Sequence, residues 1–217
     1  MKVISFLLDL LYPPRCAFCH AFLETSREGI CAQCKTGLPF AQNGGRQRFP
    51  FITACVSPLN YAGDVRESLL RYKFGGATGY AKVYARLVAE TVRAELPGEF
   101  DLITWVPLSR RRLRRRGYDQ ARLLAKATAK ALGMELTPTL YKQRNTQPQS
   151  GTGDAAKRRA NITGAYRMKK GADVTGKRVL LIDDIVTTGA TLSECARVLG
   201  KAGAEQVVCA TVARAAD

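Results

Sequence analysis

Histidine is nearly absent from this chain, whose 217 residues include only His20. This scarcity largely excludes enzymes that activate a nucleophile with histidine and metal centres that need several imidazoles. Because His20 directly follows Cys19, it is either a hydrogen-bond donor to a metal-bound thiolate or an exposed neighbour of the cysteine. We favour the exposed position.

Long hydrophobic runs are also missing. Residues 1–12 are mostly apolar, but Asp9 interrupts them and no small-residue cleavage site follows. This run is too short to span a bilayer and lacks the features of a secretory signal peptide. There is no low-complexity tract or internal repeat, and an apolar fraction of 46% suffices for a packed core. We therefore expect a soluble, cytoplasmic protein with one medium domain and a small module.

Acidic residues are few compared with basic ones, which gives the chain a formal charge of +16. The excess is concentrated in residues 101–178, where nineteen basic residues stand against five acidic ones and the net charge is +14. A local charge of this size attracts polyanions and exceeds what a single nucleotide substrate requires. The sequence therefore predicts affinity for nucleic acid in this segment.

The seven cysteines are an odd number, which does not suit a disulfide framework. Four of them form two Cys-x-x-Cys pairs, Cys16/Cys19 and Cys31/Cys34, separated by eleven residues. This spacing turns the thiolates of each pair toward a common ion, so that the four complete a closed, structural Zn²⁺ site. A redox pair or unliganded cytosolic thiols are the alternatives.

The predicted domains follow from these cysteines. Residues 1–40 are a zinc ribbon too short to bury a core without its metal. Residues 41–50 are rich in turn formers and predict a linker, and residues 51–217 form the main domain. The remaining cysteines lie in apolar contexts that predict small buried side chains: Cys55, Cys195 and Cys209.

Residues 179–192 are the most informative part of the sequence. An apolar run predicts a buried parallel strand that ends at Asp183 and Asp184, and a loop of hydroxyl and glycine residues leads into a helix near Thr191. Backbone N–H groups of such a loop and helix start converge on one point, where the helix dipole favours an anion. The two carboxylates can accept hydrogen bonds from a diol or help to hold a metal ion. A phosphate site beside a diol site is typical of a binding site for ribose 5-phosphate. The alternative is an ordinary strand–turn–helix with solvated acids.

The rest of the chain alternates apolar strands with amphipathic helices. The pattern predicts strands over residues 54–61, 101–106, 136–141, 162–168 and 206–212, and helices over residues 64–74, 80–96 and 119–132. Residues 143–160 are polar and without periodicity, which predicts a mobile loop. The alternation indicates an α/β fold whose parallel sheet is flanked by helices and binds its ligand at the carboxyl ends of the strands.

A run of arginines follows the predicted strand that ends near Pro107. Six arginines surround Leu113 in residues 110–116, at the edge where the sheet should bind its ligand. Guanidinium groups bind phosphates through paired, charge-assisted hydrogen bonds. The run therefore predicts an anion site, and a solvated charged face is the alternative.

Together these motifs resemble the ComF family, which includes the GntX-like proteins. That family joins an amino-terminal zinc ribbon to a type I phosphoribosyltransferase-like domain. The resemblance covers nearly the whole chain and rests on the four paired cysteines and on the following segments: Tyr72-Lys73-Phe74, Val106-Pro107-Leu108, Arg116-Gly117-Tyr118-Asp119-Gln120, Arg159-Ala160-Asn161 and residues 183–191.

The resemblance implies a site for phosphoribosyl pyrophosphate (PRPP) with Mg²⁺, in which the acidic pair holds the ribose hydroxyls and the loop holds the 5-phosphate. The implied PRPP-binding residues are Asp183, Asp184, Thr187, Thr188, Gly189, Ala190 and Thr191. Residues 107–111 correspond to the pyrophosphate loop and residues 143–160 to the flexible hood loop. The cations expected to offset charge on the pyrophosphate are Arg110, Arg111, Lys142 and Arg144. Members of the family are associated with DNA uptake in naturally competent bacteria.

Two positions depart from the family's pattern. Asp119 stands where the family has asparagine, a change expected to weaken any anion contact there. Thr187 stands where purine-salvage phosphoribosyltransferases often place an acid. Orotate-type enzymes also have a threonine at this position. The loop therefore shows no general base for a nucleobase.

Three functions agree with the sequence. The first is phosphoribosyl transfer from PRPP through an oxocarbenium-like state, with the acceptor and the catalytic residues unassigned. The second is nucleic-acid binding without turnover, with Trp105 for base stacking and these further candidates: Arg112, Arg114, Arg115, Arg116 and Tyr118. The third is a PRPP-sensing regulator that binds a protein partner through the ribbon. We favour a ComF-type protein that binds PRPP and single-stranded DNA and serves DNA uptake or nucleotide metabolism, in an unassigned oligomeric state.

Overall fold

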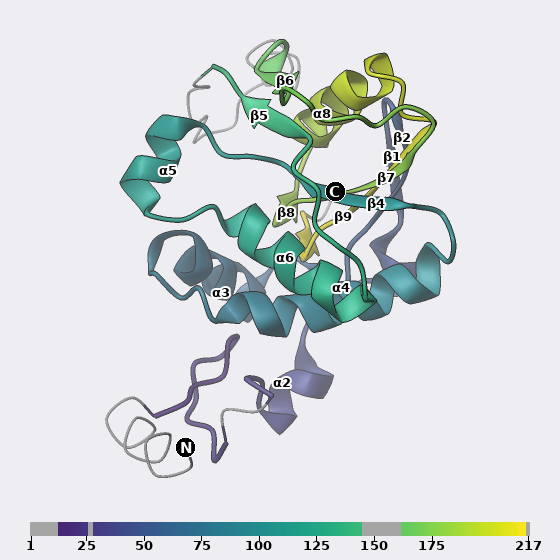
Figure 1. Ribbon diagram of the computed structural model, residues 1–217. Helices are drawn as coiled ribbons and strands as arrows, with labels where there is room; N and C mark the ends of the chain where they lie inside the picture. The colour runs from purple at the N-terminus through teal and green to yellow at the C-terminus, as the bar shows by residue number, and fades with distance from the viewer. Residues whose placement is uncertain (1–12, 26–27, 145–161, 216–217) are drawn as a thin grey trace.

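A five-stranded sheet forms the centre of the computed structural model, which describes residues 13–25, 28–144 and 162–215 (Figure 1). Across the sheet the strands are β1 (Gln47–Phe49), β2 (Ile52–Val56), β9 (Gln206–Ala210), β7 (Arg178–Ile182) and β4 (Leu102–Trp105). The last four pair in parallel, and β1 pairs with β2 in antiparallel orientation at the edge. The central strands are buried on both faces, which explains their unbroken apolar sequences.

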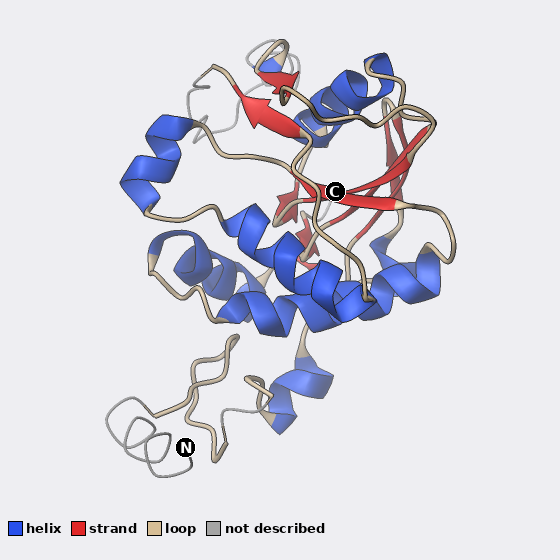
Figure 2. Cartoon of the chain, viewed as in Figure 1, coloured by secondary structure: helices blue, strands red, loops and turns tan. Residues whose placement is uncertain are grey.

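Helices cover both faces of this sheet (Figure 2). One face packs against α3 (Gly63–Phe74), α4 (Tyr80–Glu95) and α6 (Gln120–Leu132). The other face packs against α8 (Ala190–Lys201). Neighbouring residues of β7 divide between the two cores, since Leu180 belongs to the first and Leu181 to the second. The expected α/β architecture of parallel strands flanked by helices is thus confirmed.

Short strands and a short helix surround the carboxyl edge of the sheet. Parallel pairing joins β3 (Leu59–Asn60), β10 (Ala213–Arg214) and β8 (Ile185–Val186), and antiparallel pairing joins β5 (Leu140–Lys142) and β6 (Tyr166–Met168). The arginine run forms α5 (Arg110–Arg116), a helix that the sequence analysis did not predict. Ser109 caps its start, and Gly117 ends it with a φ of 82°.

The amino-terminal module packs directly on the main domain. Cys16, Phe18 and Cys34, the last from α2 (Ala32–Gly37), belong to the same core cluster as α3 and α4. Residues 41–50, expected to be a linker, contain the short helix η1 (Gln42–Gly45) and strand β1. Turn formers therefore lead into a strand here, because the edge of β2 offers partners for backbone hydrogen bonds.

The predicted elements differ from the observed ones mainly around β5 and β6. The strand expected over residues 136–141 is confined to β5, and Leu136 makes only an isolated bridge with Ile103. The strand expected over residues 162–168 begins at Tyr166. Most of the predicted mobile loop, residues 145–160, lies outside the described residues. In the described part of the chain, no helix combines the length and hydrophobicity needed to cross a membrane.

Candidate functional site

The acidic pair lies at the carboxyl end of β7. Asp183 Oδ1 accepts a hydrogen bond of 2.8 Å from the backbone N–H of Asp184. Residue 183 is partly exposed, but desolvation of its carboxyl group together with the charge of Asp184 raises the pKa of Asp183 well above its ordinary value. Asp184 is 4% exposed, and its Oδ2 lies 3.2 Å from Nζ of Lys73. The pair is therefore a partly desolvated acceptor site, with Lys73 at ion-pair distance.

The loop after the acidic pair leads into α8 as predicted, and the helix starts at Ala190, one residue before the expected Thr191. Gly189 adopts a φ of 68°, and a Cβ there would lie 2.2 Å from the ring of Phe49. Only glycine fits this turn, because both its conformation and its contact exclude a side chain. The N–H groups of the first helical turn have no partner within the helix, so they are available to an anion at the loop.

Phe49 is a residue of this site that the sequence analysis missed. It belongs to β1, within the segment expected to be a linker, and its ring packs on the loop at Gly189. Only the alternating Gln47-Arg48-Phe49 pattern hinted at a strand, and three residues are too few for a reliable prediction.

The arginines of α5 divide between two faces. Arg112 and Arg116 are partly buried, whereas the remaining four, Arg110, Arg111, Arg114 and Arg115, are exposed. Arg116 donates a hydrogen bond to the side chain of Gln120, and its guanidinium carbon lies 4.9 Å from the centre of the Phe74 ring. Burial lowers the pKa of Arg116, while the charge of Asp184 opposes that shift. One face of α5 therefore turns toward the acidic pair and the other toward solvent.

A pocket of about 620 Å³ separates α5 from the strand β5. Its lining includes three of the four predicted pyrophosphate residues and no acid: Ser109, Arg110, Arg111, Arg114, Tyr141, Lys142 and Gln143. Lys142 is only 8% exposed, and its Nζ lies 4.9 Å from the centre of the Tyr166 ring. Burial, aided by the charge of Arg112, lowers the pKa of Lys142 to about 8, while the charge of Asp183 opposes the shift. Lys142 is thus electrostatically linked to both the arginine helix and the acidic pair.

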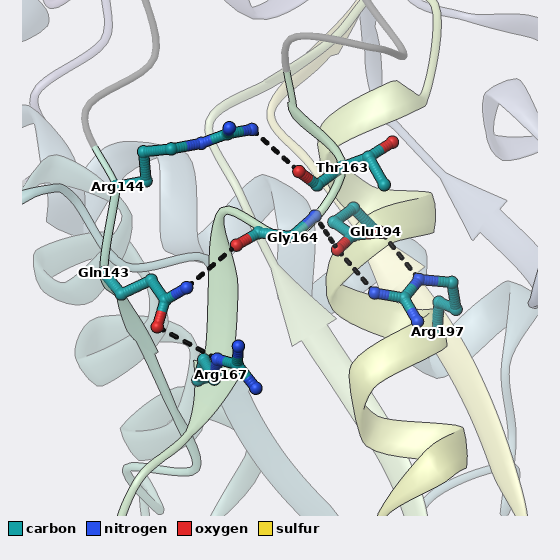
Figure 3. Close-up of polar contacts among 7 residues, drawn as sticks. All are labelled: Gln143, Arg144, Thr163, Gly164, Arg167, Glu194 and Arg197. Carbon is teal, nitrogen blue, oxygen red and sulfur yellow. Dashed lines mark hydrogen bonds and ion pairs between the residues drawn. The ribbon is translucent and has the colours of Figure 1, made fainter.

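Arg144, the fourth predicted pyrophosphate residue, lies outside this lining. Its guanidinium group donates a hydrogen bond of 2.8 Å to the backbone carbonyl of Thr163 (Figure 3). Beside it, the Gln143 side chain donates to the carbonyl of Gly164 at 3.2 Å and accepts from Arg167 at 2.9 Å. These bonds join the chain that enters residues 145–161 to the chain that leaves them.

The same network reaches α8. The backbone N–H of Gly164 donates to Glu194 Oε1 at 2.7 Å, and Arg197 binds both carboxylate oxygens of Glu194 at 2.7 Å (Figure 3). Although burial raises the pKa of Glu194, the hydrogen bonds from Arg197 and Gly164 hold it below its ordinary value. The base of the predicted hood is therefore anchored on the helix that follows the glycine loop.

Asp119 makes contacts that the sequence analysis did not foresee. It caps α6 through a bond from the N–H of Arg122 at 3.1 Å, and it also accepts from Leu108 N at 3.1 Å and Trp105 Nε1 at 3.3 Å. Its neighbour Tyr118, a predicted stacking residue, is partly buried and donates its hydroxyl hydrogen to the carbonyl of Tyr72. Both residues thus connect α6 to neighbouring segments of the site.

The four paired cysteines form the second candidate site. Their sulfur atoms all lie within 4.8 Å of one another, and those of Cys19 and Cys31 are 3.7 Å apart. Ideal tetrahedral zinc with Zn–S bonds of about 2.3 Å places its sulfurs about 3.8 Å apart. Although burial raises the pKa of Cys16, hydrogen bonds from the backbone of Cys31, Phe18 and Cys19 lower it to about 7, whereas burial raises the pKa of Cys19 and of Cys34. The arrangement therefore fits a tetrahedral, thiolate-bound metal ion.

The sheet order, the acidic pair and the glycine loop define a type I phosphoribosyltransferase fold, preceded by a zinc ribbon. Residues 119–217 match the family model for the phosphoribosyl transferase domain, and residues 7–45 match the model for the double zinc ribbon domain. The alignments with curated relatives extend over nearly the whole chain and so include both parts. The protein belongs to the family of competence protein ComF and DNA utilization protein YhgH, as the sequence motifs predicted.

Three relatives illustrate this membership. DNA utilization protein YhgH of Salmonella typhimurium is 31% identical over 223 residues, which cover 91% of this chain and 96% of the relative. Competence protein F of Haemophilus influenzae is 28% identical over 93% of this chain and 97% of the relative. Competence protein ComFC of Streptococcus pneumoniae is 31% identical over 88% of this chain and 84% of the relative. Among solved structures, adenine phosphoribosyltransferase from Leishmania tarentolae aligns with 76% of this chain and 79% of its own, at 15% identity and a TM-score of 0.41.

Proposed function

We propose that this protein binds PRPP, or a related phosphoribosyl ligand, with Mg²⁺ at the carboxyl edge of its central sheet. The observation that carries the proposal is the placement of three complementary groups around one edge. An acidic pair suits a diol, the Gly189 turn at the start of α8 suits a phosphate, and a pocket without acids suits a pyrophosphate. The charge of Asp183 raises the pKa of Lys142 against the effect of burial, so the acidic pair and this lysine interact across the same region.

In this proposal each part of the ligand has its own residues. The 5-phosphate takes the N–H groups of the loop, from Thr187 to Thr191, and the ribose hydroxyls donate to Asp183 and Asp184. The pyrophosphate lies toward Arg110, Arg111 and Lys142, where Mg²⁺ would enter with the pyrophosphate oxygens and offset their charge. Thr187 is exposed and offers a hydroxyl rather than a carboxylate, so the loop itself supplies no base for an acceptor.

We further propose that the cysteine cluster holds a structural Zn²⁺. Four thiolates at tetrahedral spacing leave no coordination position for a substrate. The metal would fix the loop from Cys16 to Cys19, whose Phe18 is 1% exposed and packs 5.7 Å from the ring of Tyr84. The zinc would then stabilise the main core as well as the ribbon.

A second proposed activity is binding of single-stranded DNA. The outer face of α5 supports it, since four exposed arginines follow one another there without an acidic neighbour in the helix: Arg110, Arg111, Arg114 and Arg115. The names of the relatives, which refer to competence and DNA utilization, point to the same partner and to a role in DNA uptake.

Calorimetric titration with PRPP and Mg²⁺ tests the principal proposal. The native protein should bind in a saturable, one-to-one manner, and the double variant Asp183→Asn/Asp184→Asn should lose most of this affinity. The double variant Glu90→Gln/Glu135→Gln removes the same charge from exposed positions outside the site and should bind normally. Equal binding by the two double variants, or no binding by the native protein, would refute the proposal.

A further inference from the structure

Lys73 makes an ion pair within the proposed ribose site. It lies in the last turn of α3, and its Nζ is 3.2 Å from Oδ2 of Asp184. The Lys73 side chain is 22% exposed and that of Asp184 is 5% exposed, so the pair is largely shielded from water. A contact of this kind orients both partners more strongly than an exposed ion pair would.

Acidic and basic groups both surround Asp184. Burial and the nearby charge of Asp184 raise the pKa of Asp183 and of Asp119, and Arg116 is a second cation that interacts with Asp184. Lys73 is at ion-pair distance, but the angles do not form a hydrogen bond, and within the described residues no other group donates one to Oδ2. A buried carboxylate oxygen with no hydrogen-bond donor is unfavourable, so Oδ2 depends on the charge of Lys73 for its stabilisation.

The backbone of Lys73 is held in place from two sides. The preceding residue, Tyr72, is fully buried, and its hydroxyl donates to the carbonyl of Gln120 at 2.7 Å. Earlier in the same helix, Ser68 and Arg71 donate hydrogen bonds to the carbonyls of Ala17 and Phe18 in the cysteine module. The position of the Lys73 backbone is therefore determined by the packing of α3 between this module and α6, and the ion pair with Asp184 directs its side chain.

We propose that Lys73 is a positioning residue of the ribose site, which holds the Asp184 carboxylate in the orientation that accepts the 2′,3′-diol. This inference rests on the proposed phosphoribosyl function, because it assigns the diol to Asp184. Lys73 acts on the sugar through Asp184, whereas the phosphate is bound independently by the Gly189 loop. Loss of Lys73 should therefore weaken recognition of the diol and leave recognition of the phosphate unchanged.

Titration of the full-length protein with three small ligands tests this division. The ligands are ribose 5-phosphate, 2-deoxyribose 5-phosphate and inorganic phosphate, and the variants are Lys73→Met and Lys73→Arg. Lys73→Met should reduce the affinity for ribose 5-phosphate by about tenfold or more, as loss of a charged contact of roughly 1.4 kcal/mol would. Its affinity for inorganic phosphate should stay native, and Lys73→Arg should recover most of the affinity for ribose 5-phosphate.

The outcomes separate the inference from the function on which it rests. If the native protein does not prefer ribose 5-phosphate to the 2-deoxy sugar, the proposed function fails, and the inference with it. If the native protein shows this preference and Lys73→Met retains it, or binds ribose 5-phosphate more tightly, the role of Lys73 is refuted. Native phosphate binding shows that a variant is folded, and Lys73→Gln replaces Lys73→Met in the same comparison should the latter not fold.

Discussion

Asp119 ties the loop after β4 to the start of α6, because its Oδ2 accepts a hydrogen bond from the backbone N–H of Leu108 at 3.1 Å while its Oδ1 caps the helix. Both oxygens of the carboxylate are used as acceptors. An asparagine has only one acceptor oxygen and cannot receive the same set of donors. The carboxylate of Asp119 therefore connects the proposed pyrophosphate loop to α6 through both of its oxygens.

The first prediction concerns this connection. Asp119→Ala should lower the free energy of unfolding by about 1–3 kcal/mol, because it removes a helix cap and leaves the Leu108 N–H without its acceptor. Asp119→Asn should retain part of this stability, since its single oxygen can accept one of the two backbone bonds. Urea unfolding followed by circular dichroism measures both variants. Native stability of Asp119→Ala would show that the carboxylate does not hold the loop.

The second prediction concerns pH. The pKa of Lys142 is lowered to about 8, so its ammonium group binds anions below this pH and loses its charge as the pH rises through it. The affinity for pyrophosphate should therefore fall between about pH 7 and 9, well below the range of an ordinary lysine, near 10.4. Lys142→Arg should bind with a flatter profile, because arginine stays charged throughout.

Calorimetry at a series of pH values measures this effect. Lys169→Arg makes the same substitution at an exposed lysine outside the pocket lining and should keep the native profile. A native profile in Lys142→Arg would mean that another group controls the pH dependence.

The third prediction uses the two faces of α5. Arg112→Ala/Arg116→Ala should weaken PRPP binding by about tenfold or more, since these arginines lie on the face near the acidic pair. Arg115→Ala removes a charge from the exposed face, at an arginine that does not line the proposed pyrophosphate pocket. It should leave PRPP binding unchanged and lower the salt dependence of single-stranded DNA binding by about 0.7 in log–log slope.

The two variants serve as controls for each other. Alanine favours the helix at all three positions, so their effects report on the lost charges rather than on unfolding of α5. Equal effects of both variants on both ligands would show that the faces of α5 are not functionally distinct.

The fourth prediction concerns the metal. Removal of zinc with a chelator should lower the melting temperature of the entire chain, because Cys16 and Phe18 are part of the core that includes α3 and α4. Hydrogen exchange should increase in α3, whose Ser68 and Arg71 bind carbonyls of the cysteine module. Added zinc should reverse both changes. Faster exchange confined to the cysteine module, with an unchanged melting temperature, would contradict this structural role.

The sequence was sufficient to predict the parts of the site that depend on local patterns. The strand β7, the acidic pair and the start of α8 follow one another directly, so their geometry is set by neighbouring residues. The four cysteines were equally predictable, because metal coordination requires their spacing. The four parallel strands of the central sheet were also predicted, since continuous apolar runs bounded by turns indicate buried strands.

Other features depend on contacts between distant segments, which a single sequence does not reveal. Phe49 reaches Gly189 only because β1 joins the edge of the sheet, and Lys73 meets Asp184 only because α3 packs between the cysteine module and α6. The arginine run looked uniform until its helical conformation separated Arg112 and Arg116 from the others. The charges alone do not show which arginines lie on the buried face of the helix and which on the exposed face.

The most direct test of the phosphoribosyl site is a crystal structure of the protein grown with PRPP and Mg²⁺. The account predicts that the 5-phosphate lies against the backbone N–H groups of residues 187–191, with the ribose hydroxyls on Asp183 and Asp184 and the pyrophosphate directed toward Lys142. A ligand bound elsewhere, or at this edge of the sheet with its ribose away from the acidic pair, would contradict the account.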